Sequence, residues 1–330
     1  MNENYGLRVF GKSMIEKESR LIAKFALLLI SLAALITCSI AQENGSDYSS
    51  NQADYWLNKG LILAGAGSYD EAYRAYDKAI QIDPKNAGAW NGEALALRAL
   101  ALSRHDLHEY NESLKAFDMA IEQYDRAIKA NPKDANNWYF RGLALSDKAI
   151  TMQASAMFNV SSDEKDKIGY FGEAIKAYDN ATEINPKFAA AWKNKGNVLY
   201  SLGKYNESIQ LYDKAIEIVS DYPLAWYDKG LALNKTGKYD EAVLAYNKAI
   251  EKIPRNADIW YNKGNALSSQ SKYDDAIDSY DKAIQLNQAF AEAWYGKGVA
   301  FKKSGFGYEA KAALEKAKHM SNKVQLVDFL

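Results

Sequence analysis

Residues 192–212 read WKNKGNVLYSLGKYNESIQLY, residues 226–246 read WYDKGLALNKTGKYDEAVLAY, and residues 260–280 read WYNKGNALSSQSKYDDAIDSY. Each segment begins with tryptophan, has glycine four residues later (position W+4) and ends on tyrosine twenty residues later (W+20). The seven tryptophans of the chain lie at 56, 90, 138, 192, 226, 260 and 294, with spacings of 34, 48, 54, 34, 34 and 34 residues. A recurring period of this length indicates stacked copies of one structural unit rather than separate globular domains.

The apolar positions of the unit predict two helices. Trp, Tyr and Ala recur at intervals of three, four and seven residues, which places one apolar stripe on each helix. Prolines 84, 132, 186 and 254 close four copies, where the ring would end the second helix. Glycine inside a helix costs about 1 kcal/mol relative to alanine. We therefore expect the W+4 glycine to mark a close approach of the two helices, with the small residue at W+16 facing it.

This pattern resembles the tetratricopeptide repeat, whose signature W-x2-L-G-x2-Y, A-x3-F and P spans 34 residues. The resemblance covers residues 53–324. It implies an all-α, right-handed superhelical solenoid of about seven helix–turn–helix hairpins, in the copies 53–86, 87–134, 135–188, 189–222, 223–256, 257–290 and 291–324. There are two departures: lysine usually replaces the leucine before the glycine, and Ser220, Gln288 and Asn322 replace the closing proline.

The second and third copies are longer than the others, by 14 and 20 residues. Matching Tyr110–Ser113 to Tyr205–Ser208 places seven extra residues before Tyr110 and seven after Ala120, which lengthens both helices by about two turns. In the third copy, Ser161–Glu164 is typical of a capping box. The two long hairpins could bury their extra turns against each other. Alternatively, residues 148–168, with the apolar side chains Met152, Met157, Phe158 and Val160, could form a docking ridge for a partner.

The first 41 residues are typical of an export signal or an N-terminal membrane anchor. The apolar stretch 25–41 follows Lys17, Arg20 and Lys24, and small residues precede a cut before Gln42. Its 17 residues are slightly fewer than the roughly 20 that span a bilayer, but Leu21 and Ile22 extend the stretch, so an uncleaved leader could associate with a membrane through residues 21–41. We expect a polar linker over 42–52 and a C-terminal tail over 325–330. Two further possibilities for this segment are that translation begins at Met14 and that Cys38 is lipidated.

Composition excludes several function classes. Lys+Arg 41 against Asp+Glu 42 argues against a nucleic-acid partner, which requires a clustered basic surface. One cysteine excludes an intramolecular disulfide. We find no phosphate-binding loop and no nucleophile with its partners. His105 and His108 could share a helix face, but two histidines without a third ligand make a weak metal site, so we expect two solvated turn residues. We therefore expect no enzyme activity, cofactor or metal in this chain.

The family resemblance directs attention to the first helix of each copy, which lines the concave groove of such arrays. Tyrosine rings can cover ligand side chains, while asparagine amides can bond a peptide backbone. The predicted peptide-binding residues are Tyr139, Lys193, Asn197, Tyr227, Tyr261, Asn262, Asn265 and Tyr295. Some members of the family bind a terminal carboxylate with a Lys/Asn/Asn/Lys/Arg set. Lys193 and Asn197 match its start, but Asp228, Asp258 and Asn262 do not, so the sequence favours a partner segment with some positive charge.

Six N-x-[Ser/Thr] sequons occur, and we expect glycosylation at Asn44, Asn111, Asn159 and Asn206 but not at the helical Asn180. Together these features predict a non-catalytic interaction scaffold outside the cytoplasm, secreted or anchored on the outer face of the cytoplasmic membrane. It would bind an extended peptide or protein segment. The alternative is a membrane-associated assembly subunit of a secretion, glycosylation or proteolytic complex.

Overall fold

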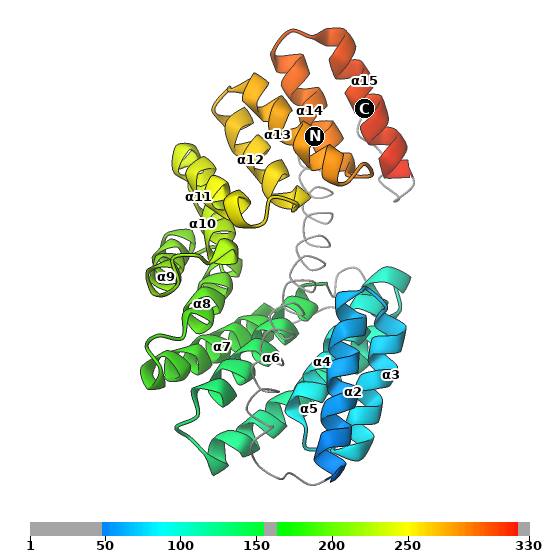
Figure 1. The fold of residues 1–330 in the computed structure, drawn as a ribbon, viewed down its shortest axis with the longest axis vertical. Coiled ribbons are helices and arrows are strands. Elements are labelled where there is room, and N and C mark those ends of the chain that lie inside the picture. The colour runs from blue at the N-terminus through cyan, green and yellow to red at the C-terminus, as the bar shows by residue number, and fades with distance from the viewer. Residues whose placement is uncertain (1–47, 155–163, 323–330) are drawn as a thin grey trace. The chain divides into compact units, whose positions relative to one another are not determined.

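The computed structural model describes residues 48–154 and 164–322, and all regular structure in these ranges is helical. Consecutive helices in these ranges pack as seven antiparallel pairs, each with an A helix followed by a B helix (Figure 1). The chain divides into two compact units between Asn185 and Pro186. The helices of unit 1 are α2 (Tyr48–Gly65), α3 (Tyr69–Ile82), α4 (Ala87–Arg104), α5 (Leu107–Ala130), α6 (Ala135–Gln153) and α7 (Glu164–Ile184).

Unit 2 contains four pairs of nearly constant length. Its helices are α8 (Ala189–Ser201), α9 (Tyr205–Ile218), α10 (Pro223–Lys235), α11 (Tyr239–Lys252), α12 (Ala257–Ser269), α13 (Tyr273–Leu286), α14 (Ala291–Lys303) and α15 (Gly307–Asn322). Within the described ranges, no helix is both apolar enough and long enough to cross a bilayer. The predicted leader 1–41 and tail 325–330 lie outside the described residues. Helix α2 begins at Tyr48, within the stretch expected to be a linker.

The turn inside each regular pair depends on one residue with left-handed backbone. Gly67, Gly203, Gly237 and Gly305 have φ between 75° and 86°, eleven residues after their tryptophans. Glycine adopts this conformation at no steric cost, so it ends the A helix and lets the chain reverse. Ser271 occupies the same position between α12 and α13 with φ 59°. The turn between α12 and α13 therefore keeps the same geometry, although serine adopts left-handed backbone less readily than glycine.

The W+4 glycine faces the W+20 tyrosine. A Cβ added to Gly196 or Gly230 would lie 2.7 and 2.5 Å from Cε1 of Tyr212 and Tyr246. The prediction that the small W+16 residue fills this gap is therefore wrong, because the flat edge of an aromatic ring enters it instead. The W+16 residues, such as Ala242, are buried nearby on the B helix. The glycine is needed to admit a ring rather than a small side chain.

Tryptophan side chains form hydrogen bonds that link a helix pair to the turn preceding it. The indole Nε1 of Trp90, Trp138, Trp192, Trp226, Trp260 and Trp294 donates to the main-chain carbonyl six residues earlier, at 2.9–3.2 Å. That carbonyl belongs to proline in four cases, and to Ser220 and Gln288 in the others. The missing prolines therefore leave this bond intact.

The lysines that replace the expected leucine at W+3 lie over the tryptophan rings. Lys229 Nζ is 5.3 Å from the centre of the Trp226 ring, and the same contact occurs at Trp56, Trp192, Trp260 and Trp294. Lys229 also pairs with Asp213 of the preceding repeat at 2.6 Å, and Lys297 pairs with Asp281 at 2.5 Å. A cation at W+3 thus lies over the tryptophan of its own helix and joins the preceding pair through the carboxylate.

The long hairpins of unit 1 bury their extra turns against each other. Ala154, at the end of α6, packs with Ala101 and Leu102 of α4 and Tyr110 of α5. Lys148 of α6 bonds both Asp118 of α5 and Tyr170 of α7. This supports the first of the two alternatives for the lengthened helices. The predicted capping box and most of the Met-rich tip fall on residues 155–163, outside the described ranges, although α7 does begin at Glu164.

Candidate functional site

In unit 2, asparagine side chains on the A helices form hydrogen bonds with tyrosine hydroxyls of the same or the preceding repeat. Within a repeat, the W+20 hydroxyl of Tyr212 donates to Asn197 Oδ1 at 2.9 Å, and that of Tyr280 donates to Asn265 Oδ1 at 2.8 Å. Between repeats, Asn262 Nδ2 on α12 donates to the hydroxyl of Tyr227 on α10 at 3.0 Å. We call the residues Asn197, Tyr227, Tyr261, Asn262 and Asn265 the tyrosine–asparagine row.

The tyrosines that follow the tryptophans pack against the W+20 rings. The ring centres of Tyr227 and Tyr246 are 6.1 Å apart, and those of Tyr261 and Tyr280 are 6.0 Å apart. In unit 1, Tyr139 packs on Tyr178 in the same way, at 6.1 Å. Tyr227 is 4% exposed and Tyr139 is 5% exposed. These two rings are thus structural supports beneath the surface. Tyr261 and Tyr295 are half-buried and keep part of their surface in solvent.

Lys193 of α8 is committed to an internal ion pair. Its side chain is buried, and Nζ lies 3.5 Å from Asp228 Oδ2 on α10. Burial raises the pKa of Asp228, while Lys193 and a hydrogen bond from Asn197 lower it. Because Asp228 neutralises the ammonium, Lys193 does not present a free positive charge for a ligand carboxylate. This agrees with the sequence argument against a terminal-carboxylate clamp.

Nearby carboxylates act electrostatically on the hydroxyls of Tyr227 and Tyr261. Burial raises the pKa of Tyr227 well above its usual value, and Asp258 and Asp228 raise it further. For Tyr261, burial, Glu292 and Asp258 raise the pKa to about 12, although a hydrogen bond with Asn265 lowers it. These tyrosines are therefore neutral near pH 7 and act as hydrogen-bonding groups.

Repeat 5 departs from the bonding pattern of its neighbours. Position W+5 holds asparagine in repeats 4 and 6 but Leu231 in repeat 5. As a result, the hydroxyl of Tyr246, a fully buried residue, has no hydrogen-bond partner among the described residues. Tyr76 in repeat 1 has the same lack, where Leu61 holds W+5. Sequence reasoning missed Tyr246. The sequence does carry a signal for it: at position W+5, Leu231 of repeat 5 stands between the asparagines Asn197 and Asn265 of the neighbouring repeats.

The structure therefore brings together six of the predicted residues: Lys193, Asn197, Tyr227, Tyr261, Asn262 and Asn265. Tyr295 lies on α14 of the same unit, and Tyr139 belongs to unit 1. The row offers half-buried amides and ring edges held in place by internal bonds. Amide groups of this kind can both donate and accept hydrogen bonds.

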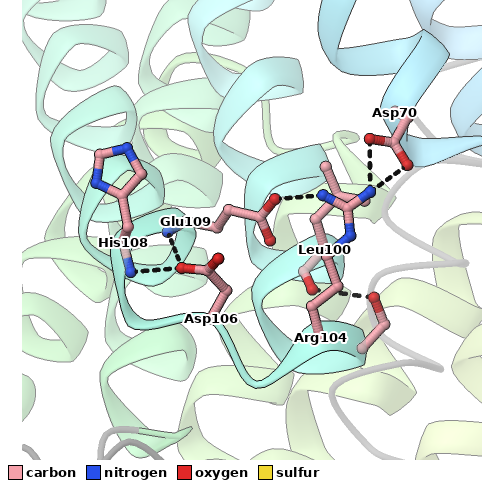
Figure 2. A network of polar contacts seen from close by, with 7 residues as sticks. Asp70, Leu100, Arg104, Asp106, His108 and Glu109 are labelled. Atoms are coloured by element: carbon pink, nitrogen blue, oxygen red, sulfur yellow. Dashed lines mark hydrogen bonds and ion pairs between the residues drawn. The ribbon is translucent and has the colours of Figure 1, made fainter.

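His105 and His108 are exposed residues at the turn between α4 and α5 and do not share a helix face. His105 caps the C-terminus of α4 with left-handed backbone (φ 56°), while His108 lies in the first turn of α5. The charged centre at this turn is Arg104, which bonds Asp70 of α3 and Glu109 of α5 at 2.5–2.7 Å (Figure 2). Within the described ranges, no group of three or more potential ligands is placed to hold a metal ion.

Of the predicted glycosylation sites, Asn111 and Asn206 are exposed near the start of B helices. Each is followed two residues later by a serine whose hydroxyl is buried: Ser113 donates to the Ala94 carbonyl, and Ser208 donates to the Tyr205 carbonyl. Asn180 lies in α7 and bonds the Lys176 carbonyl. Asn44 and Asn159 lie outside the described residues.

Family models described as "TPR repeat" match residues 196–237 and 230–271, and models described as "Tetratricopeptide repeat" match 53–86, 154–188, 177–210 and 257–290. The matches 53–86 and 257–290 correspond to the helix pairs α2/α3 and α12/α13. The chain belongs to the tetratricopeptide repeat family. Proteins of this family are generally non-catalytic scaffolds for protein–protein interaction, and the fold of this chain supports that role.

Several tetratricopeptide repeat proteins of known structure have a similar fold. TTC0263 from Thermus thermophilus is 20% identical, with a TM-score of 0.50 over 65% of this chain and 98% of that one. YrrB, described as having an unusual peptide-binding site, is 20% identical, with a TM-score of 0.49 over 62% and 96%. MamA is 25% identical, with a TM-score of 0.47 over 50% and 99%.

A curated relative also matches a short part of the chain. The uncharacterized protein MJ0572 of Methanocaldococcus jannaschii is 35% identical over 54 residues. The match covers 16% of this chain and 63% of that relative, which is less than two thirds of its length.

Proposed function

We propose that this protein is a non-catalytic scaffold that binds an extended peptide or protein segment along the A helices of unit 2. The observation that carries the proposal is the bond between Asn262 and Tyr227, which joins the amide of one repeat to the hydroxyl of the preceding repeat. Side chains fixed by internal bonds lose little conformational entropy when a ligand binds, which favours affinity. The half-buried Asn197, Asn262 and Asn265 would bond the ligand, while the buried Tyr227 and Lys193 hold them in place.

Crosslinking of the full chain in its native cell, followed by mass spectrometry, tests this proposal. Crosslinks between a partner and residues of α8, α10, α12 and α14 are expected. Asn262→Ala should weaken binding of the captured partner about tenfold, which corresponds to roughly 1.4 kcal/mol. Leu244→Ala is the matched control, because Leu244 is 65% exposed on the B helix α11. A partner that loses affinity with Leu244→Ala but not with Asn262→Ala would refute binding on the A helices and favour an assembly subunit docked through its B helices.

We also propose that the scaffold works outside the cytoplasm. The apolar stretch 25–41 behind a basic flank and the six sequons support this location. If the leader is cleaved, the native protein begins at Gln42, and exposed Asn111 and Asn206 carry glycan in a host that glycosylates exported proteins. Mass spectrometry of the native N-terminus and cell fractionation measure this directly. A cytoplasmic protein that retains residues 1–41 would contradict the proposal.

A further inference from the structure

Helix α2 exposes two large apolar side chains at positions that are buried in the later repeats. Tyr55, the residue before the tryptophan (W−1), is 59% exposed, and Ile62, at W+6, is 72% exposed. In the later repeats, the residues at W+6 are at most 2% exposed: Ala96, Ala144, Val198, Ala232, Ala266 and Ala300. The residues at W−1 are fully buried in five of these repeats: Ala89, Ala191, Ala225, Ile259 and Ala293. The outer face of α2 therefore lacks the cover that the other A helices have.

The cover on the other A helices is the B helix of the preceding repeat. At the junction of α13 and α14, Ala300 (W+6) packs with Tyr280 (W+20). At the same junction, Ala293 (W−1) packs with Ile284 (W+24). Within the described residues, no B helix precedes α2. The terminal helix of a repeat array normally turns a polar face outward, so an apolar outer face on α2 indicates that another helix packs there.

An ion pair accompanies the apolar contacts at several junctions. The W+3 residue of an A helix pairs with the W+21 carboxylate of the preceding B helix, as Lys297 does with Asp281 at 2.5 Å. Lys59 holds W+3 on α2, where it is exposed and lies 4.8 Å from the centre of the Trp56 ring. Because no B helix precedes α2 in the described part of the chain, Lys59 has no carboxylate of this kind.

The last described helix, α15, carries residues that fit these three positions of α2. Its residues at W+20, W+21 and W+24 are Leu314, Glu315 and Lys318, of which Glu315 and Lys318 are exposed. In the other regular repeats, tyrosine holds W+20 and isoleucine holds W+24. No A helix follows α15 within the described ranges to cover this face.

Two residues of α15 match α2 in size and in charge. Leu314 is smaller than the usual tyrosine, which leaves room for Ile62 where the other junctions have alanine or valine at W+6. Glu315 is the W+21 carboxylate that Lys59 lacks. An interface between α2 and α15 would thus conserve volume at one position and pair opposite charges at another.

The third match joins Lys318 to Tyr55. At the other junctions, the W+24 isoleucine packs on a small or aliphatic W−1 residue, as Ile284 does on Ala293. At α15 and α2, both partners differ from this pattern: the aliphatic part of a lysine can cover apolar surface while its ammonium lies over an aromatic ring. All three unusual residues on α2 therefore have a counterpart on α15.

We propose that copies of this chain associate end to end, with α2 of one copy packed on α15 of the next in the manner of consecutive repeats. Two different surfaces meet in such a contact, so a third copy can bind where the first two leave a face open. The contact uses no residue of the tyrosine–asparagine row, so this inference stands independently of the proposed function.

Sedimentation velocity of the purified full chain tests the proposal. We expect the sedimentation coefficient to rise with concentration over the micromolar range. Ile62→Ser should weaken association about tenfold, because this position would no longer bury a large apolar side chain. Leu244→Ser changes a similarly exposed apolar residue of α11 and is the matched control, which should alter affinity less than about twofold.

Charge reversal identifies the surfaces that meet. Lys59→Glu or Glu315→Lys alone places like charges opposite each other and should weaken association about three- to tenfold. Mixing the two variants should restore association, because each reversed charge then faces its opposite on the other variant. Lys214→Glu reverses an exposed lysine of α9 and should leave association unchanged. Circular dichroism checks that each variant is folded.

Three results would overturn the proposal. The first is a monomer at every concentration. The second is association that Ile62→Ser weakens but that the mixture of Lys59→Glu and Glu315→Lys does not restore, since α2 would then meet a surface other than α15. The third is association that none of these variants changes, which would assign it to another part of the chain, such as residues 1–41. None of these results bears on the crosslinking test of the A helices.

Discussion

Gly230 and Tyr246 approach so closely that a Cβ on the glycine would lie 2.5 Å from Cε1 of the ring. Real side chains do not tolerate this distance, so the ring or the helix would have to move. We expect Gly230→Ala to destabilise the protein by about 1–3 kcal/mol, despite the higher helix propensity of alanine.

The matched control for Gly230→Ala is Gly169→Ala in α7. An added Cβ there meets nothing within 4 Å, so alanine should stabilise the helix by up to about 1 kcal/mol. Urea denaturation followed by circular dichroism measures both variants. Equal effects of the same sign would show that the contact between glycine and tyrosine does not determine the packing.

Arg98 and Asp147 form a buried ion pair between α4 and α6. Nη1 lies 3.7 Å from Oδ1, and the two side chains are 1% and 5% exposed. No nitrogen of the guanidinium has a hydrogen-bond partner among the described residues. Removing one partner leaves an uncompensated buried charge, so Arg98→Met alone should cost about 3 kcal/mol.

Replacing both partners of this pair removes both buried charges. Arg98→Met with Asp147→Leu should therefore recover most of the stability lost in the single variants. Lys248→Met breaks the exposed pair with Glu251 and should change stability by less than about 1 kcal/mol. A double variant as unstable as the sum of the two singles would contradict this account.

Glu93 takes the W+3 position that lysine holds in the regular repeats. Burial and the nearby carboxylates of Asp77 and Glu112 raise its pKa to about 7. Because the folded state then holds a proton that the unfolded state has released, stability decreases as pH rises from about 4.5 to 7. Glu93→Gln should be more stable than the natural protein by about 2 kcal/mol at pH 8, and this difference should vanish below pH 4.5.

Thermal melts across this pH range test the role of Glu93. Glu183→Gln, at an exposed position of α7, should leave the pH profile unchanged. Glu93→Lys would restore the W+3 cation and should pair with Asp77, as Lys229 pairs with Asp213. A natural protein whose stability does not vary between pH 5 and 8 would argue against a raised pKa.

Ser271 has φ 59° where the other regular repeats have glycine. A side chain in the left-handed region costs about 1 kcal/mol relative to glycine. We therefore expect Ser271→Gly to raise stability by about 0.5–1 kcal/mol, and Gly237→Ala to lower it by a similar amount. A calorimetric Tm that falls in Ser271→Gly would show that the serine side chain contributes a stabilising contact.

The sequence was sufficient to predict the helix pairs, because the tryptophan, glycine and proline positions repeat and each has a direct mechanical role. It did not predict which side chain meets the W+4 glycine, since both Ala242 and Tyr246 lie on the same B helix. Nor did it separate buried from half-buried tyrosines: Tyr227 and Tyr261 occupy equivalent positions and differ in burial. That difference depends on neighbouring repeats. The sequence left open whether His105 and His108 share a helix face; they do not, because the left-handed residue His105 ends α4 before the next helix begins.

The bond from each indole to the preceding turn has a consequence for how such a chain can change. Its acceptor is a main-chain carbonyl, so Ser220 and Gln288 serve as well as proline does. Substitutions at this joint should accumulate without disturbing the angle between one hairpin and the next. Whole repeats could then be duplicated or lost during evolution, and the remaining repeats would still stack on one another at the same angle.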